Sequence, residues 1–173
     1  ITIASAGSTQ IAGNIYTFNA DQYLTGNSSD GTAENGPTKN VVNLTLSGDD
    51  SWLKGGVVDE GASAADGTGT NLTLSQTAVW SNTGDSTVTR LTANEGRIEV
   101  LEGSVTAEAF EGTAEVALKG EVADDGSIKT TTFTARSAAD DAHVDAHYQG
   151  VASDDVVGRQ LVGVSGVAAT GYG

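Results

Sequence analysis

The sequence predicts an all-β protein, built as a parallel β-helix (a β-solenoid) in which short strands stack coil upon coil. The first observation is a repeated segment, because Asn43–Ser47 (NLTLS) returns as Asn71–Ser75. The second is that Trp52 returns as Trp80 at the same offset. A fixed offset between apolar runs is typical of repeat folds, in which each unit buries its apolar face by stacking on its neighbours.

Within both copies of the repeat, leucines alternate with small polar residues. Such alternation places the leucines on one face of a strand and the polar side chains on the other. We therefore expect the apolar residues of this region to stack between coils. The expected stacking residues are Leu44, Leu46, Trp52, Leu72, Leu74, Trp80, Val88, Leu91, Ile98 and Val100.

The remaining runs are short and β-prone. They lie near residues 1–3, 15–18, 86–88, 91–93, 97–100, 104–107, 113–118 and 127–135. Gly7 and Gly13 supply turns near the start, and Asp124-Asp125-Gly126 supplies another near the end of this series. Two polar segments, residues 25–40 and 59–70, are expected to be exposed loops and the carriers of any specific binding.

The last part of the chain is less regular. Residues 137–148 fit either a helix capped by Ser137 or a strand with Ala142, Val144, Ala146 and Tyr148 facing inward, and we favour the strand. Residues 151–173 fit a capping helix, a final strand or a flexible exit. We therefore divide the chain into a β-helix segment, 1–150, and a C-terminal tail or cap, 151–173.

An antiparallel β-barrel or sandwich is the alternative fold, because short strands of even spacing suit a meander nearly as well as a solenoid. The links in the repeated region lack the two-residue Asn-Gly or Asp-Gly signal of a hairpin between strands long enough to form a ladder. This favours the solenoid.

The composition limits the classes of partner. The formal net charge is −15, with 8 Lys and Arg against 23 Asp and Glu, so the surface repels nucleic acid and anionic membrane. There is no cysteine, which excludes disulfides and thiol chemistry. No apolar run approaches the roughly 20 residues of a membrane-spanning helix.

The segment from residue 72 to residue 100 resembles the passenger domains of Gram-negative autotransporters of the pertactin and AIDA-like type. The resemblance rests on an aromatic-bearing strand with Leu72, Leu74 and Trp80, the turn sequence Thr83–Val88 (TGDSTV), the Leu91 strand and Ile98–Val100. It extends over about residues 41–105 and is looser from there to Tyr148. The family has Gly-Gly where this chain has Glu95-Gly96.

The resemblance implies a right-handed, single-stranded parallel β-helix that is surface-displayed or secreted by a bacterium. It implies a stalk, adhesin or aggregation factor without catalysis or cofactor, held at the outer membrane through a C-terminal barrel outside these residues. The expected partners are a host or bacterial surface receptor or glycan, or a second copy of the chain. The excess of carboxylates predicts that self-association strengthens at low pH.

Some residues could instead carry chemistry. On a strand, His143, Asp145 and His147 share one face and could hold Zn²⁺, but they also fit outward polar positions, which we favour. Acidic pairs could bind Ca²⁺ or supply the two carboxylates of a polysaccharide-degrading β-helix enzyme, but turns explain them better. These pairs are Asp49-Asp50, Asp124-Asp125, Asp140-Asp141 and Asp154-Asp155. The two tryptophans could stack on sugars, although we favour stacking on each other between coils.

Overall fold

The computed structural model describes residues 1–4, 7–27, 33–151 and 162–172. Within them the protein is all-β and contains no helix, and most of its strands pair in parallel. The described part of the chain therefore offers no helix with the length and hydropathy needed to cross a bilayer.

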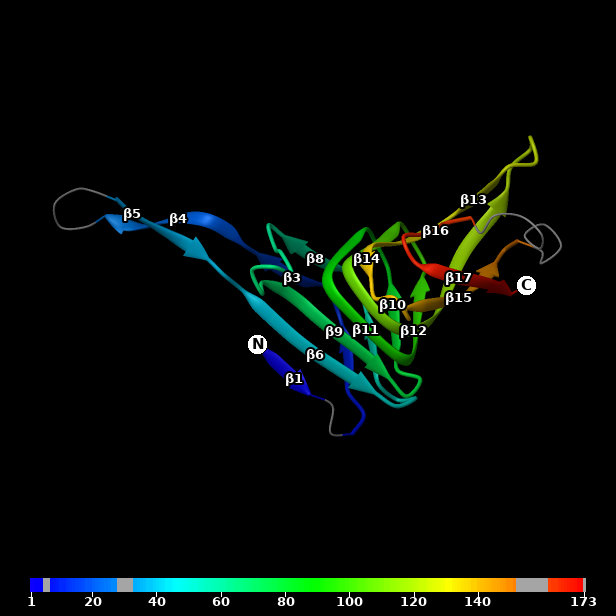
Figure 1. Ribbon diagram of the computed structural model, residues 1–173, viewed down its shortest axis with the longest axis horizontal. Helices are drawn as coiled ribbons and strands as arrows, with labels where there is room; N and C mark the ends of the chain where they lie inside the picture. Colours follow the sequence, from blue (N-terminus) through cyan, green and yellow to red (C-terminus); the bar gives the residue numbers. More distant parts are fainter. Residues whose placement is uncertain (5–6, 28–32, 152–161, 173) are drawn as a thin grey trace.

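The parallel strands form three columns, which the chain visits in turn and then visits again (Figure 1). The first column holds β1 (Thr2–Ala4), β6 (Val41–Ser47) and β9 (Gly69–Ser75). The second holds β2 (Gln10–Ala12), β7 (Trp52–Lys54), β10 (Val79–Asn82), β15 (His143–Gln149) and β17 (Ala168–Tyr172). The third holds β3 (Ile15–Phe18), β8 (Val57–Glu60) and β16 (Val164–Ser165).

Three strands run from one column into the next. They are β11 (Ser86–Val100), β12 (Ser104–Val122) and β14 (Thr132–Ala138). The longest-range case is β11, which pairs with β8 of the third column, β9 of the first and β10 of the second. Because this pairing is parallel, the antiparallel barrel or sandwich is wrong for the body of the protein.

The predicted leucine repeat is paired residue by residue. Leu44 lies opposite Leu72, and Leu46 lies opposite Leu74, in parallel strands. In the next coil Leu72 lies opposite Leu91. All of these leucines are buried. Parallel pairing of the NLTLS segments is therefore confirmed.

The tryptophans do not follow the same register, so the prediction that Trp52 stacks on Trp80 is wrong. Trp80 lies opposite Leu53, and Trp52 lies opposite Val79. Trp80 is fully buried and its indole N–H donates to the carbonyl of Gly55 at 2.9 Å, whereas Trp52 is half-buried. The turn between β9 and β10, residues 76–78, has one residue fewer than the turn between β6 and β7, residues 48–51. A slip of one residue in a strand exchanges its two faces.

The other expected stacking residues also lie in the core. Trp80 is opposite Ile98, and Ile98 is opposite Val116 in the next coil. Val88 and Val100 are buried in the same core, which extends to an edge-to-face pair of Phe110 and Phe133 with centroids 5.6 Å apart. The core is thus one continuous apolar stack along the columns.

Two antiparallel hairpins project from the body (Figure 1). One consists of β4 (Ala20–Asn27) and β5 (Ala33–Thr38). The predicted loop at 25–40 is thus wrong in its described part, because a projecting segment can satisfy its backbone groups by pairing with itself. The other consists of the end of β12 and β13 (Ile128–Thr130), joined by the predicted turn at Asp124–Gly126.

The C-terminal elements continue the columns. Residues 143–149 form a strand, as favoured, with Val144, Ala146 and Tyr148 buried. In the expected tail, β16 pairs with β14 and β17 pairs with β15. The tail as far as it is described is therefore part of the same sheet, and Asp154-Asp155 lies outside the described residues.

We expect Trp80→Ala to lower the free energy of unfolding by about 3–5 kcal/mol, the usual cost of removing a large buried aromatic side chain. Trp52→Ala, its matched control on the outer face, should cost less than about 1 kcal/mol. Urea unfolding followed by circular dichroism measures both. Equal losses would contradict the register described for β7 and β10.

Burial raises the pKa of Tyr148, whose hydroxyl donates to the carbonyl of Val162 at 2.9 Å. Because the unfolded phenol ionises near pH 10, this contribution to stability is complete below about pH 10 and is lost as the pH rises through the folded pKa. Tyr148→Phe should therefore flatten the alkaline fall in stability. Urea midpoints measured between neutral and strongly alkaline pH test this, and unchanged pH dependence in the variant would contradict it.

Candidate functional site

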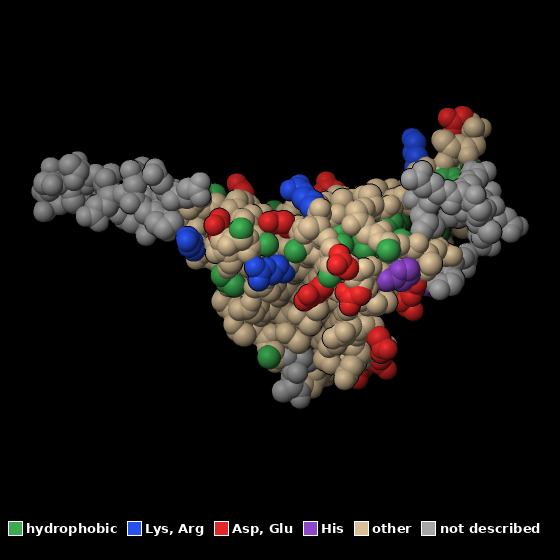
Figure 2. All heavy atoms as spheres, viewed as in Figure 1, with side chains coloured by type: hydrophobic (Ala, Val, Ile, Leu, Met, Phe, Trp, Pro, Cys, Tyr) green, Lys and Arg blue, Asp and Glu red, His purple; other side chains and the backbone are tan. Residues whose placement is uncertain are grey.

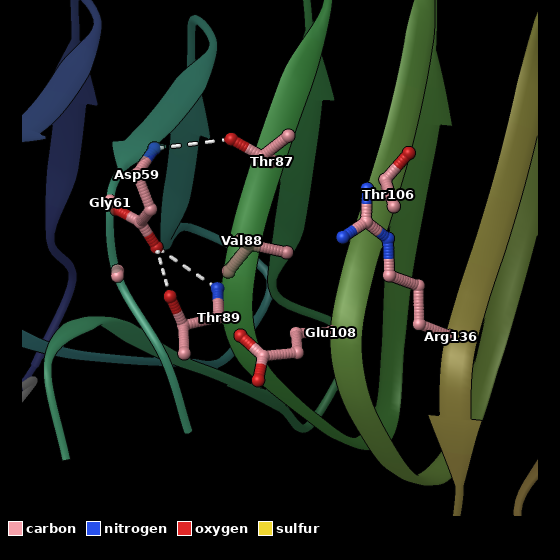
Figure 3. Close-up of a pocket in the computed structure, with 9 residues that line it drawn as sticks. Asp59, Gly61, Thr87, Val88, Thr89, Thr106, Glu108 and Arg136 are labelled. Atoms are coloured by element: carbon pink, nitrogen blue, oxygen red, sulfur yellow. Dashed lines mark hydrogen bonds between the residues drawn. The ribbon is translucent and has the colours of Figure 1, made fainter. Parts of the chain in front are cut away.

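The candidate site lies at the corner where the chain passes from the third column to the first. A hollow of about 270 Å³ opens there, which we call the corner hollow (Figure 3). It is lined by Asp59, Gly61, Ala62, Thr87, Val88, Thr89, Thr106, Glu108 and Arg136. These residues come from β8, β11, β12 and β14 and from the loop at 61–68.

Asp59 joins several coils at this corner. Its Oδ1 accepts from the hydroxyls of Thr17 and Thr70 at 3.0 and 2.7 Å. Its Oδ2 accepts from the N–H of Thr70 at 2.8 Å, and from the N–H and hydroxyl of Thr89 at 2.9 Å each. All three threonines are buried. Asp59 therefore supplies acceptors to polar groups that water does not reach, which is a structural task.

The loop at 61–68 is held over the corner by a second set of contacts. Its residue Ala64 donates its N–H to Glu108 Oε1 at 3.1 Å and accepts at its carbonyl from Arg90 Nη2 at 2.5 Å. Glu108 and Arg90 therefore bind the N–H and the carbonyl of the same residue, Ala64. The loop forms a wall of the corner hollow.

Beyond that wall lies a second hollow of about 460 Å³ on the first column. Its lining residues include Arg90, Glu111, Ser137 and Phe110. Ala64 also lines this second hollow, whereas Gly61 and Ala62 of the same loop line the corner hollow. Figure 2 shows that basic and acidic side chains are interspersed on the face of the molecule seen in that view.

Glu108 and Arg136 occupy equivalent positions on successive coils. Their neighbours pair in parallel on both sides, with Ala107 opposite Ala135 and Ala109 opposite Ser137. The side chains nevertheless diverge, with Glu108 directed toward Thr89 and Arg136 toward Thr106 (Figure 3). No ion pair of 4.0 Å or less joins them, nor does any described acid pair with Arg136.

The predicted His143-x-Asp145-x-His147 motif lies on the outer face of β15. His143 Nε2 is 3.1 Å from Asp145 Oδ1 and 3.1 Å from the hydroxyl of Thr170, which itself donates to Asp145 Oδ1 at 2.8 Å. Within the described ranges no three His, Cys, Asp or Glu side chains come together as a metal-binding group. The motif instead ties β15 to β17.

The predicted acidic pairs lie on separate turns. Asp49-Asp50 precedes β7, Asp124-Asp125 lies at the tip of the β12–β13 hairpin, and Asp140-Asp141 precedes β15. Asp49 accepts a hydrogen bond from the hydroxyl of Thr77. Hydrogen bonds from the hydroxyl and N–H of Ser127 hold the pKa of Asp125 below its usual value. None of these pairs lines the corner hollow.

The residues of the corner hollow were not found from the sequence, although a signal exists. Thr106-Ala107-Glu108 returns as Thr134-Ala135-Arg136, and the two triplets lie opposite each other. A search for repeats that allowed any residue at the third position would have found this pair. The change from acid to base at the third position obscures it.

Comparison of the chain with protein-family models, with curated proteins and with solved structures gives no match.

We expect Asp59→Ala to lower the free energy of unfolding by at least about 2 kcal/mol, because each buried N–H left without an acceptor costs about 1–3 kcal/mol. Asp66→Ala is the matched control, since the side chain of Asp66 is exposed and accepts no hydrogen bond from the described residues. Urea unfolding measures both losses. An Asp59→Ala variant as stable as the control would contradict the joining role of this carboxylate.

Proposed function

We propose that the chain is a non-catalytic β-helix scaffold of a bacterial surface-displayed or secreted protein, of the autotransporter passenger kind. In this proposal the three columns close into a right-handed, single-stranded solenoid. Its task is to present outward side chains and loops to a receptor, a glycan or a second copy of the chain.

The in-register parallel pairing of the columns carries the proposal. In a column such as β1–β6–β9–β11–β12, successive strands pair in parallel and in register, and their buried apolar side chains are Leu, Val, Ala, Ile and Phe. Such a stack grows by adding coils, each of which contacts only its neighbours, and it produces an extended surface. That geometry suits display over a distance.

The outward rows of the columns support a role in recognition. Thr45, Thr73 and Thr92 follow one another in register on the first column. Thr87, Thr106 and Thr134 do so on the third. Hydroxyls are both donors and acceptors, so these rows suit polar ligands such as glycans. The surplus of 15 negative charges disfavours nucleic acid as a partner.

The hydrogen bonding of the carboxylates at the corner supports a non-catalytic role. A glycosidase needs two carboxylates that act on the same bond as acid and base or nucleophile. Asp59 lines the hollow beside Glu108, but it accepts five hydrogen bonds from the protein itself. A carboxylate so occupied is poorly placed to exchange a proton with a ligand.

The proposal is tested by displaying the chain on a non-adherent bacterium through a heterologous anchor, with an epitope tag to report its level. We expect faster autoaggregation or stronger binding to glycan-coated surfaces than with Leu74→Asp, which places a charge in the buried core at an equal tag signal. Equal behaviour of the two strains would contradict the proposal. So would the release of new reducing ends when the purified chain is incubated with polysaccharides.

A further inference from the structure

The corner hollow contains an opposite-charge pair that does not close. Glu108 and Arg136 are neighbours on successive coils, yet their side chains turn apart (Figure 3). Glu108 is held toward the loop by the N–H of Ala64, which contacts only Oε1. Its second oxygen and the Arg136 guanidinium have no partner among the described residues.

The neighbouring face shows what such a pair does where nothing holds it apart. Arg97 and Glu115 also lie opposite each other on successive coils, and their side chains meet at 3.3 Å. The same arrangement of acid and base is therefore closed on the second column and open at the corner. The open pair leaves a gap, bounded by a carboxylate on one side and a guanidinium on the other.

The groups around this gap define the chemistry of a ligand. Arg136 offers a planar fork of donors that fits a carboxylate in bidentate fashion. Glu108 accepts from hydroxyls, while Thr106 and Thr87 contribute hydroxyls from two successive coils. A ligand that satisfies all of them carries both hydroxyl groups and one carboxylate.

The volume of the hollow and the charge around it restrict the class of ligand further. A hollow of about 270 Å³ lies just below the range of about 300–1,000 Å³ typical of small-molecule sites, so it suits one sugar ring rather than a larger group. Because Glu108 and Asp59 line the same hollow and the protein carries a net charge of −15, a singly charged group is favoured over a phosphate.

We propose that the corner hollow binds a uronic acid residue of an acidic oligosaccharide, with its carboxylate on Arg136 and a ring hydroxyl on Glu108. The inference deepens the proposed function and rests on it, because it names the glycan class that the scaffold would recognise. A failure to bind uronate leaves the display experiment untouched, so the two can fail separately.

The test is titration of the purified chain with a galacturonic acid trimer, followed by amide chemical shifts and by calorimetry. We expect shifts centred on Thr87, Thr106 and Arg136. Arg136→Gln should weaken binding about tenfold or more, the effect expected for loss of a charge-assisted bidentate contact. Arg136→Lys should recover only part of the affinity, because an ammonium lacks the planar fork.

Arg97→Gln is the matched control. It removes one positive charge from the adjacent face, where the arginine is already paired, and should leave the affinity unchanged. The proposal is overturned if the uronate trimer does not bind, or if a neutral galactose trimer binds as tightly. It is also overturned if inorganic phosphate competes on equal terms, or if the Arg97 and Arg136 variants lose affinity alike.

Discussion

Parallel pairing in register is the constraint on which the rest of this structure depends. Once Val41–Ser47 lies beside Gly69–Ser75, each inward residue of one coil is covered by the residue at the same position in the next. The backbone groups of the strands are satisfied between coils, and the apolar side chains are buried by the same contact. The core therefore needs no helix to cover it.

The corners present a harder problem than the faces, because the chain turns there and its backbone groups leave the ladder. At the corner between the third and first columns, the carboxylate of Asp59 accepts from residues of three coils. Trp80 acts in a similar way inside the stack, where its indole N–H satisfies the carbonyl of Gly55. Buried polar groups at such bends need dedicated partners, and single side chains provide them.

The sequence allowed prediction of the parallel stack because the leucine repeat lies within uninterrupted strands. The prediction failed for the tryptophans because the offset of the leucine repeat was extended across turns that differ in length by one residue. Val79, not Trp80, lies opposite Trp52, and this slip of one residue turns one indole inward and the other outward. Repeat spacing predicts which segments pair, whereas turn length decides which face each residue occupies.

The corner hollow was hidden from sequence reasoning for a related reason. Thr89, Glu108 and Arg136 hold equivalent positions on successive coils, but they share no chemistry. All three line the hollow, but Thr89 is buried against Asp59, whereas Glu108 is partly exposed and Arg136 is exposed. In a stack of this kind the inward positions are limited by the neighbouring coil, while outward positions at the same register can change freely. Stability and recognition are therefore carried by alternate residues of the same strands. This is why the apolar repeat predicts the scaffold but gives no information about the ligand.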